Sequence, residues 1–323
     1  MVRESTTVPN GSGELTAGVS RSTLSVLGSD LSVWRYSSAA VLPEGYEQDH
    51  PAASGNGDEA RDSCSRLIML HGLRGTHHGL GLIAGSLPER EVLIPDLPGF
   101  GDSGPMTAGR HDVAGYARAV VELLRELRSD GERFDLLGHS FGAVVTAAVA
   151  ARAPELVRRM VLVNPIAVSP AHGASSVLTR ITSAYYRLGE LLPGRLGRAL
   201  LSNRWIVLAA TRVMLRTRDS RVRRFVYDSH LRHFSRFHSP ALVVESYRSS
   251  LTASVEDHVE RVQAPTLLIA GATDEIAPLD GQRRLVGRFA DGRLRVLDEV
   301  GHLVHYEAPE RVAREVRSFL DES

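Results

Sequence analysis

A serine between two glycines stands where an apolar run of the chain meets a helix-like run. The segment GHSFG, with Ser140 at its centre, directly follows FDLL and directly precedes AVVTAAVAAR. A strand that passes into a helix over so few residues makes a tight turn, and the residue at the turn exposes its side chain. Glycines are needed on both sides because larger side chains would collide with the strand and the helix. The sequence therefore predicts a strand over 134–137, a helix over 141–152 and an exposed hydroxyl between them.

Short apolar runs alternate with longer helix-like segments from residue 66 onward, which is typical of a parallel sheet with crossover helices. The strands predicted in this part are 67–70, 92–95, 134–137, 160–163, 266–270 and 294–297. The predicted helices are 79–88, 112–129, 141–152, 279–289 and 308–321. Two earlier β-rich runs, 22–27 and 31–36, are joined by the hairpin residues Gly28-Ser29-Asp30. We expect a fold of the α/β class.

The alternation of strands and helices stops after one of the central strands. Between residues 166 and 254 the chain has only helical patterns, at 178–192, 204–216 and 221–237. We interpret this segment as a helical lid inserted at the carboxyl ends of the strands, where such sheets bind ligands. The predicted organisation is a flexible tail over 1–20, a core over 21–165 and 256–323, and the lid over 166–255.

The composition excludes several classes of function. All 38 basic residues are arginine, and 38 acidic residues balance them, so the net charge argues against a dedicated nucleic-acid binder. A mechanism through a Schiff-base lysine is excluded because the chain has no lysine. The single cysteine, Cys64, cannot form a disulfide within the chain. The first residues lack the apolar core of a signal peptide, so we expect a soluble cytoplasmic protein.

A serine hydroxyl is a weak nucleophile until a histidine takes its proton and an acid orients that histidine. Asp274 follows the predicted strand TLLIAG, and His302 follows LRVLDEVG. The three residues occur in the order Ser, Asp, His, each just past the carboxyl end of a strand, so their side chains can meet at one edge of the sheet. We therefore predict a catalytic triad of Ser140, His302 and Asp274.

Neighbouring residues compete for two of these roles. Glu275 is the alternative acid, and His305 is the alternative base, although it is expected to begin the last helix or pack on it. Asn164 follows another strand, but its amide cannot replace a carboxylate. The segment HLVHYE lacks the H-E-x-x-H spacing and a third ligand, so we predict no metal. The triad chemistry needs no cofactor.

Negative charge develops on the substrate carbonyl oxygen during attack, and losing one N–H donor to it typically costs about 2.7 to 4 kcal/mol. One predicted donor is the amide of Phe141, directly after the serine. The second is the amide of Leu73 in HGLRG, after the first parallel strand, where Gly72 permits a close approach. His71 precedes that glycine, and we expect it to brace the loop.

The segment 99–104 matches G-x-G-x-x-G after a strand, as a dinucleotide-binding loop would. Pro98 and Pro105 bracket it, however, and no helix begins inside it. We predict a turn-rich loop in which Asp96 and Asp102 hold backbone amides.

The segments HGLRG, DLPGFGDSG, GHSFGA, GATDEIAP and GHLVHYEAPE, in this order and spacing, resemble the α/β-hydrolase superfamily. More narrowly, the chain looks like lidded bacterial members, which include esterases, lipases, enol-lactonases and hydrolases of meta-cleavage products. The likeness covers about residues 22–165 and 256–323. It implies an α/β-hydrolase fold, a mostly parallel sheet flanked by helices. The site residues that it implies are Ser140, Asp274 and His302 for the triad and Leu73 and Phe141 for the oxyanion hole.

The expected activity is hydrolysis of a carboxylic ester or thioester through an acyl-enzyme intermediate. Dehalogenases and epoxide hydrolases of this fold use an aspartate at the turn, so Ser140 argues against both. Carbon–carbon hydrolases usually carry an aromatic residue soon after the catalytic histidine, and this chain has Leu303. The open alternatives are carbon–carbon hydrolysis of a vinylogous diketone, a perhydrolase side activity, and a ligand-binding or signalling module with slow turnover.

The expected lid is strongly basic, because residues 174–240 hold 13 arginines against Glu190, Asp219 and Asp228. One interpretation is a solvated helix face balanced by acids of the core. In a second, the lid attracts a small, apolar and anionic acyl substrate such as an acyl-CoA thioester. In a third, RWIVLAATRVMLR over 204–216 touches an anionic membrane, which would place the protein at the membrane periphery.

Overall fold

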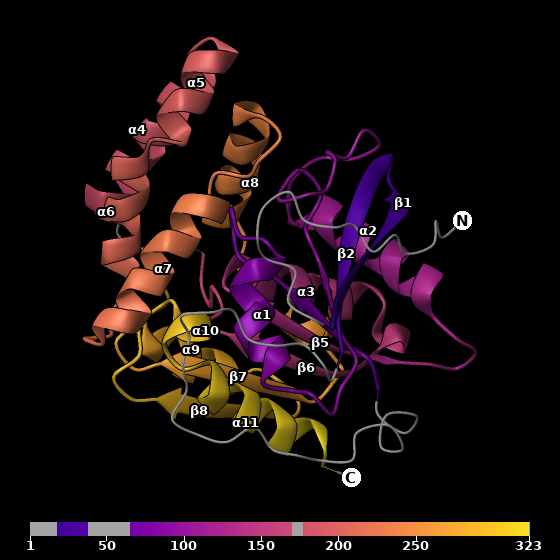
Figure 1. The fold of residues 1–323 in the computed structure, drawn as a ribbon. Coiled ribbons are helices and arrows are strands. Elements are labelled where there is room, and N and C mark those ends of the chain that lie inside the picture. The colour runs from indigo at the N-terminus through magenta and orange to yellow at the C-terminus, as the bar shows by residue number, and fades with distance from the viewer. Residues whose placement is uncertain (1–17, 38–64, 170–176, 323) are drawn as a thin grey trace.

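The computed structural model of the chain describes residues 18–37, 65–169 and 177–322 (Figure 1). The strands are β1 (Val19–Val26), β2 (Ser29–Tyr36), β3 (Leu67–Leu70), β4 (Val92–Pro95), β5 (Phe134–His139), β6 (Val157–Val163), β7 (Thr266–Gly271) and β8 (Gly292–Leu297). The core helices are α1 (His77–Gly85), α2 (Val113–Leu127), α3 (Phe141–Arg152), α9 (Leu279–Val286), α10 (Val304–Glu307) and α11 (Pro309–Leu320). Short 3₁₀ helices span Pro154–Leu156, Val255–Asp257 and Val259–Arg261. The predicted α/β fold is confirmed.

The strands form one eight-stranded sheet in the order β1-β2-β4-β3-β5-β6-β7-β8. The pairs β1–β2 and β2–β4 are antiparallel, and the other neighbours are parallel. The hairpin turn was predicted one residue too late. Val26 pairs with Ser29, so the turn consists of Leu27 and Gly28, at φ of 49° and 72°. Two residues at positive φ match the twist of the strands, and glycine adopts that conformation without strain.

Successive side chains of the parallel strands point to opposite faces of the sheet and pack in two separate buried clusters. Leu67 and Met69 of β3 pack in a cluster with α1 and α11. Ile68 and Leu70 pack in the opposite cluster with α2, α3 and α9. Because helices cover both faces of this part of the sheet, its strands are apolar at successive positions, which explains the continuous runs in the sequence.

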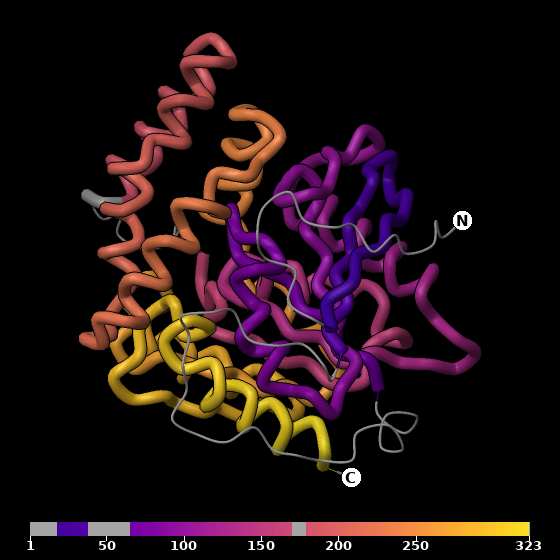
Figure 2. Tube along the Cα trace, in the orientation of Figure 1, coloured from indigo at the N-terminus to yellow at the C-terminus, as the bar shows by residue number. Residues whose placement is uncertain are grey.

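Within the described residues, five α-helices lie between β6 and β7, and we call this segment the insertion. They are α4 (Val177–Leu191), α5 (Gly194–Leu201), α6 (Arg204–Met214), α7 (Ser220–His233) and α8 (Pro240–Thr252). Figures 1 and 2 show them as a separate group beside the sheet, coloured salmon to orange. In the chain regions described here, no helix combines the length and the apolar character needed to cross a bilayer.

The sequence did not predict α5 and α8 as helices. A signal for α8 was present, because Ser239 caps its first turn by accepting the amide of Leu242 at 3.3 Å, and Pro240 occupies its first position. The helix predicted over 221–237 ends at His233, since the following residues turn to pair with the core. The predicted lid boundaries and the predicted tail over 1–20 stay predictions. Strand β1 begins at Val19 and so includes the last two residues of the predicted tail. Cys64 and residues 1–17 lie outside the described residues.

Candidate active site

Ser140 lies at the turn between β5 and α3, with φ of 54° and ψ of −116°. Residues other than glycine rarely adopt this backbone conformation, which costs about 1 to 3 kcal/mol and persists only where the surroundings impose it. The Ser140 amide donates to the Val163 carbonyl of β6 at 3.0 Å. A Cβ on either Gly138 or Gly142 would lie 2.3 Å from a neighbouring oxygen atom. The two glycines therefore allow the strand, the turn and the helix to pack this closely.

Three side chains from the carboxyl ends of three strands meet at this turn. His302, after β8, places Nε2 at 3.0 Å from Oγ of Ser140 and Nδ1 at 2.8 Å from Oδ2 of Asp274, which follows β7. His302 and Asp274 are each 5% exposed. The other carboxylate oxygen of Asp274 accepts the amides of Ile276 and Ala277 at 2.8 and 3.0 Å. The structure thus brings the three predicted residues together, and two backbone amides hold the Asp274 carboxylate in place.

The charge of Asp274 orders this arrangement. Burial alone would raise the pKa of the Asp274 carboxyl, but His302 and the two backbone amides favour the ionised form and hold the pKa below its ordinary value. An ionised carboxylate accepts Nδ1–H from the imidazole, which leaves Nε2 free to accept the serine proton. The geometry can therefore transfer the hydroxyl proton as the oxygen attacks a carbonyl carbon.

The competing residues point elsewhere. Glu275 has a 73% exposed side chain and pairs with Arg216 at 2.6 Å. His305 is buried in α10, where its ring centroid lies 4.2 Å from that of His139. Burial and the neighbouring histidines lower the pKa of His305 well below its ordinary value, so the ring is neutral. Neither residue forms a hydrogen bond with Ser140 in the structure described.

The loop after β3 lies against the serine. A Cβ on Gly72 would lie 3.4 Å from Cβ of Ser140, so the loop approaches as closely as predicted. His71 braces the loop, because Nδ1 donates to the Gly72 carbonyl at 2.8 Å and Nε2 accepts the amide of Leu97 at 2.9 Å. Phe141 begins α3, and the first amides of a helix have no partner within it. The roles of Leu73 and Phe141 as oxyanion donors stay a prediction.

Two buried side chains that we had not assigned to the site hold the main chain of His302. Nδ2 of Asn164 donates to the carbonyl oxygens of Gly301 and His302, at 2.8 and 3.1 Å. Nε2 of His139 donates to the same His302 carbonyl at 3.0 Å. Oδ1 of Asn164 accepts the amide of Gly271 at 2.7 Å. Asn164 thus connects the ends of β6 and β7 with the loop that carries His302. The sequence signal for this role was the position of a polar residue just past the end of a strand.

We expect Asn164→Gly to lower kcat by about tenfold to a hundredfold, because His302 loses part of the support that aims it at the serine. Glycine is the suitable replacement because Asn164 has φ of 44°, which would strain alanine. The test is to measure kcat, KM and Tm with a soluble ester. A lower Tm with unchanged kcat would assign Asn164 a structural role only.

A sequence model of the alpha/beta hydrolase family matches residues 67–315, which is more than half of the chain. The chain belongs to the alpha/beta hydrolase family. Its homologues are hydrolases, and this protein is a hydrolase enzyme of that family. No group of three or more metal-binding side chains gathers within the ranges that the structure describes.

This hydrolase resembles enzymes with different substrates. The 2-hydroxy-6-oxo-2,4-heptadienoate hydrolase of Pseudomonas putida is 28% identical over 298 residues, covering 87% of this chain and 95% of the relative. Lipase 3 of Moraxella sp. is 23% identical over 264 residues, covering 79% and 77%. The crystal structure of the enol-lactonase from Burkholderia xenovorans LB400 has a TM-score of 0.67 at 18% identity, covering 93% of this chain and 100% of that one.

The loop over 99–104 connects the core of the hydrolase with the insertion. It consists of turns, as predicted, and Asp96 accepts the amides of His77 and Asp102 at 2.7 and 3.0 Å. The role predicted for Asp102 was wrong, because its carboxylate pairs with Arg236 of the insertion. Phe237 pairs with Phe100 through a single β-bridge.

Arg74 makes a second connection, from the loop that carries Leu73. Its side chain is buried, and its guanidinium donates to the carbonyls of Leu201 and Phe234 at 2.6 and 3.3 Å and to the hydroxyl of Tyr186 at 3.4 Å. The guanidinium also stacks over the Phe234 ring at 4.4 Å. One side chain of the predicted oxyanion loop therefore contacts α4, α5 and the end of α7.

A column of aromatic rings makes the third connection. Trp34 of β2 stacks on His77, with ring centroids 3.8 Å apart, and His78 stacks on His233 of α7 at 3.7 Å. Burial, together with the neighbouring imidazoles of His77 and His233, lowers the pKa of His78 to about 2. Burial and the nearby Arg236 lower the pKa of His233 to about 4. Both rings of the contact between α1 and α7 are therefore neutral at neutral pH.

We expect this hydrolase to lose stability as the pH falls from about 6.5 toward 4. The unfolded chain binds protons on these histidines near their ordinary pKa, whereas the folded chain resists protonation, so acid favours unfolding. His233→Phe keeps a stacking ring and removes one titrating group, and we expect a shallower decline of Tm with pH. A parallel decline in the parent and the variant would show that the stack does not contribute.

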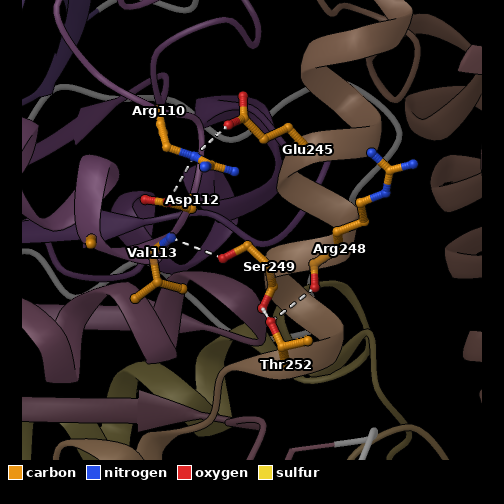
Figure 3. A pocket seen from close by; sticks show the side chains of 8 residues that line it. Arg110, Asp112, Val113, Glu245, Arg248, Ser249 and Thr252 are labelled. Carbon is orange, nitrogen blue, oxygen red and sulfur yellow. Dashed lines mark hydrogen bonds and ion pairs between the residues drawn. The ribbon is translucent and has the colours of Figure 1, made fainter.

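A pocket of about 340 Å³ lies between the start of α2 and α8 (Figure 3). Its lining residues are Arg110, Asp112, Val113, Ala114, Glu245, Arg248, Ser249 and Thr252. Arg110 donates to Glu245 at 3.1 Å, and the amide of Val113 donates to Ser249 at 3.0 Å. These two contacts join the start of α2 to α8, and the lining includes neither Ser140, Asp274 nor His302, so we assign the pocket to the seam between core and insertion.

Proposed function

We propose that this hydrolase cleaves a carboxylic ester or thioester through an acyl-enzyme intermediate. The observation that carries the proposal is the distance of 3.0 Å between Nε2 of His302 and Oγ of Ser140, with Asp274 at 2.8 Å from the opposite ring nitrogen. A buried imidazole oriented in this way serves as general base to a serine nucleophile. The mechanism needs no cofactor.

In the proposed mechanism, His302 takes the hydroxyl proton as Ser140 attacks the carbonyl carbon. The amides of Leu73 and Phe141 stabilise the negative oxygen of the tetrahedral intermediate. The protonated imidazole then gives its proton to the leaving alcohol or thiol as the bond to that group breaks. Water, deprotonated by His302, attacks the acyl-enzyme, and the collapse of the second intermediate releases the acid and returns the proton to the serine.

Carbon–carbon hydrolysis of a vinylogous diketone by the same triad is the second candidate. Its support is the similarity to the heptadienoate hydrolase, at 28% identity over most of both chains. Leu303 speaks against it, since carbon–carbon hydrolases usually carry an aromatic residue close after the histidine. In this chain Leu303 is buried among Leu82, Leu215 and Tyr306.

The insertion acts as a lid in this proposal, and the substrate is a small acyl compound that enters beside it. The loops after β3 and β4 contact the insertion through Arg74 and Asp102, and α10, which follows the loop after β8, contacts it through Glu307. A substrate carbonyl at Ser140 would therefore lie beneath these helices. Closing such a site removes water, which strengthens the electrostatic interactions inside it.

A substrate panel with the full-length protein separates the candidates. It compares p-nitrophenyl esters of short and long acids, acyl-CoA thioesters and a 2-hydroxy-6-oxo-dienoate, with a fluorophosphonate probe to label the nucleophile. Ester or thioester turnover with labelling at Ser140 supports the proposal. Turnover confined to the dienoate would establish carbon–carbon hydrolysis instead. Labelling with very slow turnover and retained ligand would favour a binding module.

A further inference from the structure

The outer helices of the insertion expose apolar side chains in two stripes. On α4, Ile181, Leu188 and Leu191 are between 49% and 71% exposed, and their spacing places them on one face of the helix. On α6, Trp205 and Val213 are 69% and 40% exposed, and they also lie on one face, about two turns apart. A single exposed apolar side chain is common in proteins, but several on one helix face are informative, so these stripes require an explanation.

The exposed apolar side chains are concentrated on these helices. Of the nine large apolar residues that are exposed within the described ranges, six lie on α4, α5 and α6, and three lie elsewhere. The six are Ile181, Leu188, Leu191, Leu196, Trp205 and Val213. A concentration of exposed large apolar side chains on neighbouring segments of a protein is typical of an interaction site.

Exposed arginines border the apolar stripes. They are Arg180, Arg187, Arg195, Arg204 and Arg212. None of the five is paired with a carboxylate among residues 18–37, 65–169 and 177–322. The segment 177–214 contains one acid, Glu190, and its carboxylate is already paired with Arg248 of α8 at 2.6 Å. This surface therefore carries a net positive charge that the described part of the protein does not neutralise.

This surface faces away from the sheet. In Figures 1 and 2, α4, α5 and α6 run along the outer side of the insertion, and α7 and α8 lie between them and the core. The packing agrees, because α8 contacts α4, α5 and α2, while α7 contacts α6, α1 and α10. We call the exposed side of α4, α5 and α6 the outer face.

We propose that the outer face docks onto an anionic lipid surface. Trp205 is the central anchor, since tryptophan favours the boundary between headgroups and acyl chains, and the Arg204 guanidinium lies 5.2 Å from its ring. The apolar stripes would enter that boundary, and the arginines would bind lipid phosphates. A second copy of the chain fits less well, because a symmetric contact through the outer face would bring arginines against arginines.

Vesicle binding by the full-length protein tests the proposal. We expect sedimentation with vesicles of equal phosphatidylcholine and phosphatidylglycerol at low salt, weaker binding at high salt, and no binding to phosphatidylcholine alone. Tryptophan emission gives an independent measurement. The chain has two tryptophans, and Trp34 is 8% exposed, so a blue shift on adding vesicles reports the transfer of Trp205 into lipid.

Matched variants locate the contact. Neutralising Arg187 and Arg204 together, as Arg187→Gln with Arg204→Gln, weakens vesicle binding by about fivefold for each charge. Trp205→Ser removes the anchor and the emission shift. The controls Arg284→Gln and Val296→Ser change an exposed arginine and an exposed valine of the core, and they bind vesicles like the parent. All variants keep the parent's Tm and its rate on a soluble ester, so failure here is distinct from failure of the proposed function.

Three results would overturn the proposal. The first is a parent protein that does not bind phosphatidylglycerol vesicles at low salt. The second is an equal loss of binding in the core controls, which would indicate general attraction of arginines to the vesicle. The third is self-association that Trp205→Ser abolishes, without vesicle binding, which would make a second copy of the chain the occupant.

Discussion

Ser140→Ala removes turnover of this hydrolase, with kcat falling by up to about 10⁶-fold. In the described residues, Nε2 of His302 contacts one nucleophile, the hydroxyl of Ser140. The variant therefore leaves the base without a proton to take. Alanine keeps the Cβ of serine and does not add strain at this turn. The measurements are kcat on the best ester of the panel and labelling by the fluorophosphonate probe.

The matched control is Ser25→Ala, which changes an exposed serine of β1 and should keep both turnover and labelling. Thermal unfolding of all three proteins excludes misfolding as the cause. Turnover by Ser140→Ala close to that of the parent would rule out the acyl-enzyme mechanism.

Asp274→Asn lowers kcat by about 10⁴-fold through a change of tautomer, as the same exchange does in other serine triads. The structure fixes the orientation of the new amide. Oδ1 of residue 274 accepts two backbone amides, so the asparagine keeps its oxygen there and turns its NH₂ toward Nδ1 of His302. Nδ1 must then accept, which moves the proton to Nε2, and Nε2 can no longer accept a proton from Ser140.

Kinetics of Asp274→Asn beside Glu275→Gln check this prediction. Glu275 is adjacent in sequence but exposed, so its variant should retain nearly full activity. Similar losses in both variants would mean that the acid has been assigned wrongly. We expect Asp274→Asn to keep a folded structure, because the two amide contacts behind the side chain remain.

The meeting of Ser140, Asp274 and His302 could be predicted from sequence because its signals are local. GHSFG lies between a strand and a helix, and Asp274 and His302 each follow an apolar run. The rule that parallel strands present their carboxyl ends at one edge then brings them together without further information. The close packing around the turn at Ser140 could also be anticipated, since Gly138 and Gly142 permit it.

What the sequence did not predict depends on contacts between distant segments. Asp102 was assigned to backbone amides because its partner, Arg236, lies in the insertion, 134 residues away along the chain. Asn164 was considered only as a possible acid, whereas its position between β6, β7 and the His302 loop follows from strand order. The short helix α5 contains Gly194 and Gly197, which weaken a helical pattern, so packing against α4 and α8 accounts for it.

The side chain of Arg74 limits how this enzyme can be re-engineered. Its charged group is buried and finds its acceptors on Leu201, Phe234 and Tyr186, all of which belong to the insertion. A shortened chain that joined β6 directly to β7 would leave that cation with no acceptor from these helices, in the loop whose Gly72 lies against Ser140. Exchange of the insertion between homologues therefore requires residue 74 to be exchanged with it. The insertion and residue 74 should be transferred together.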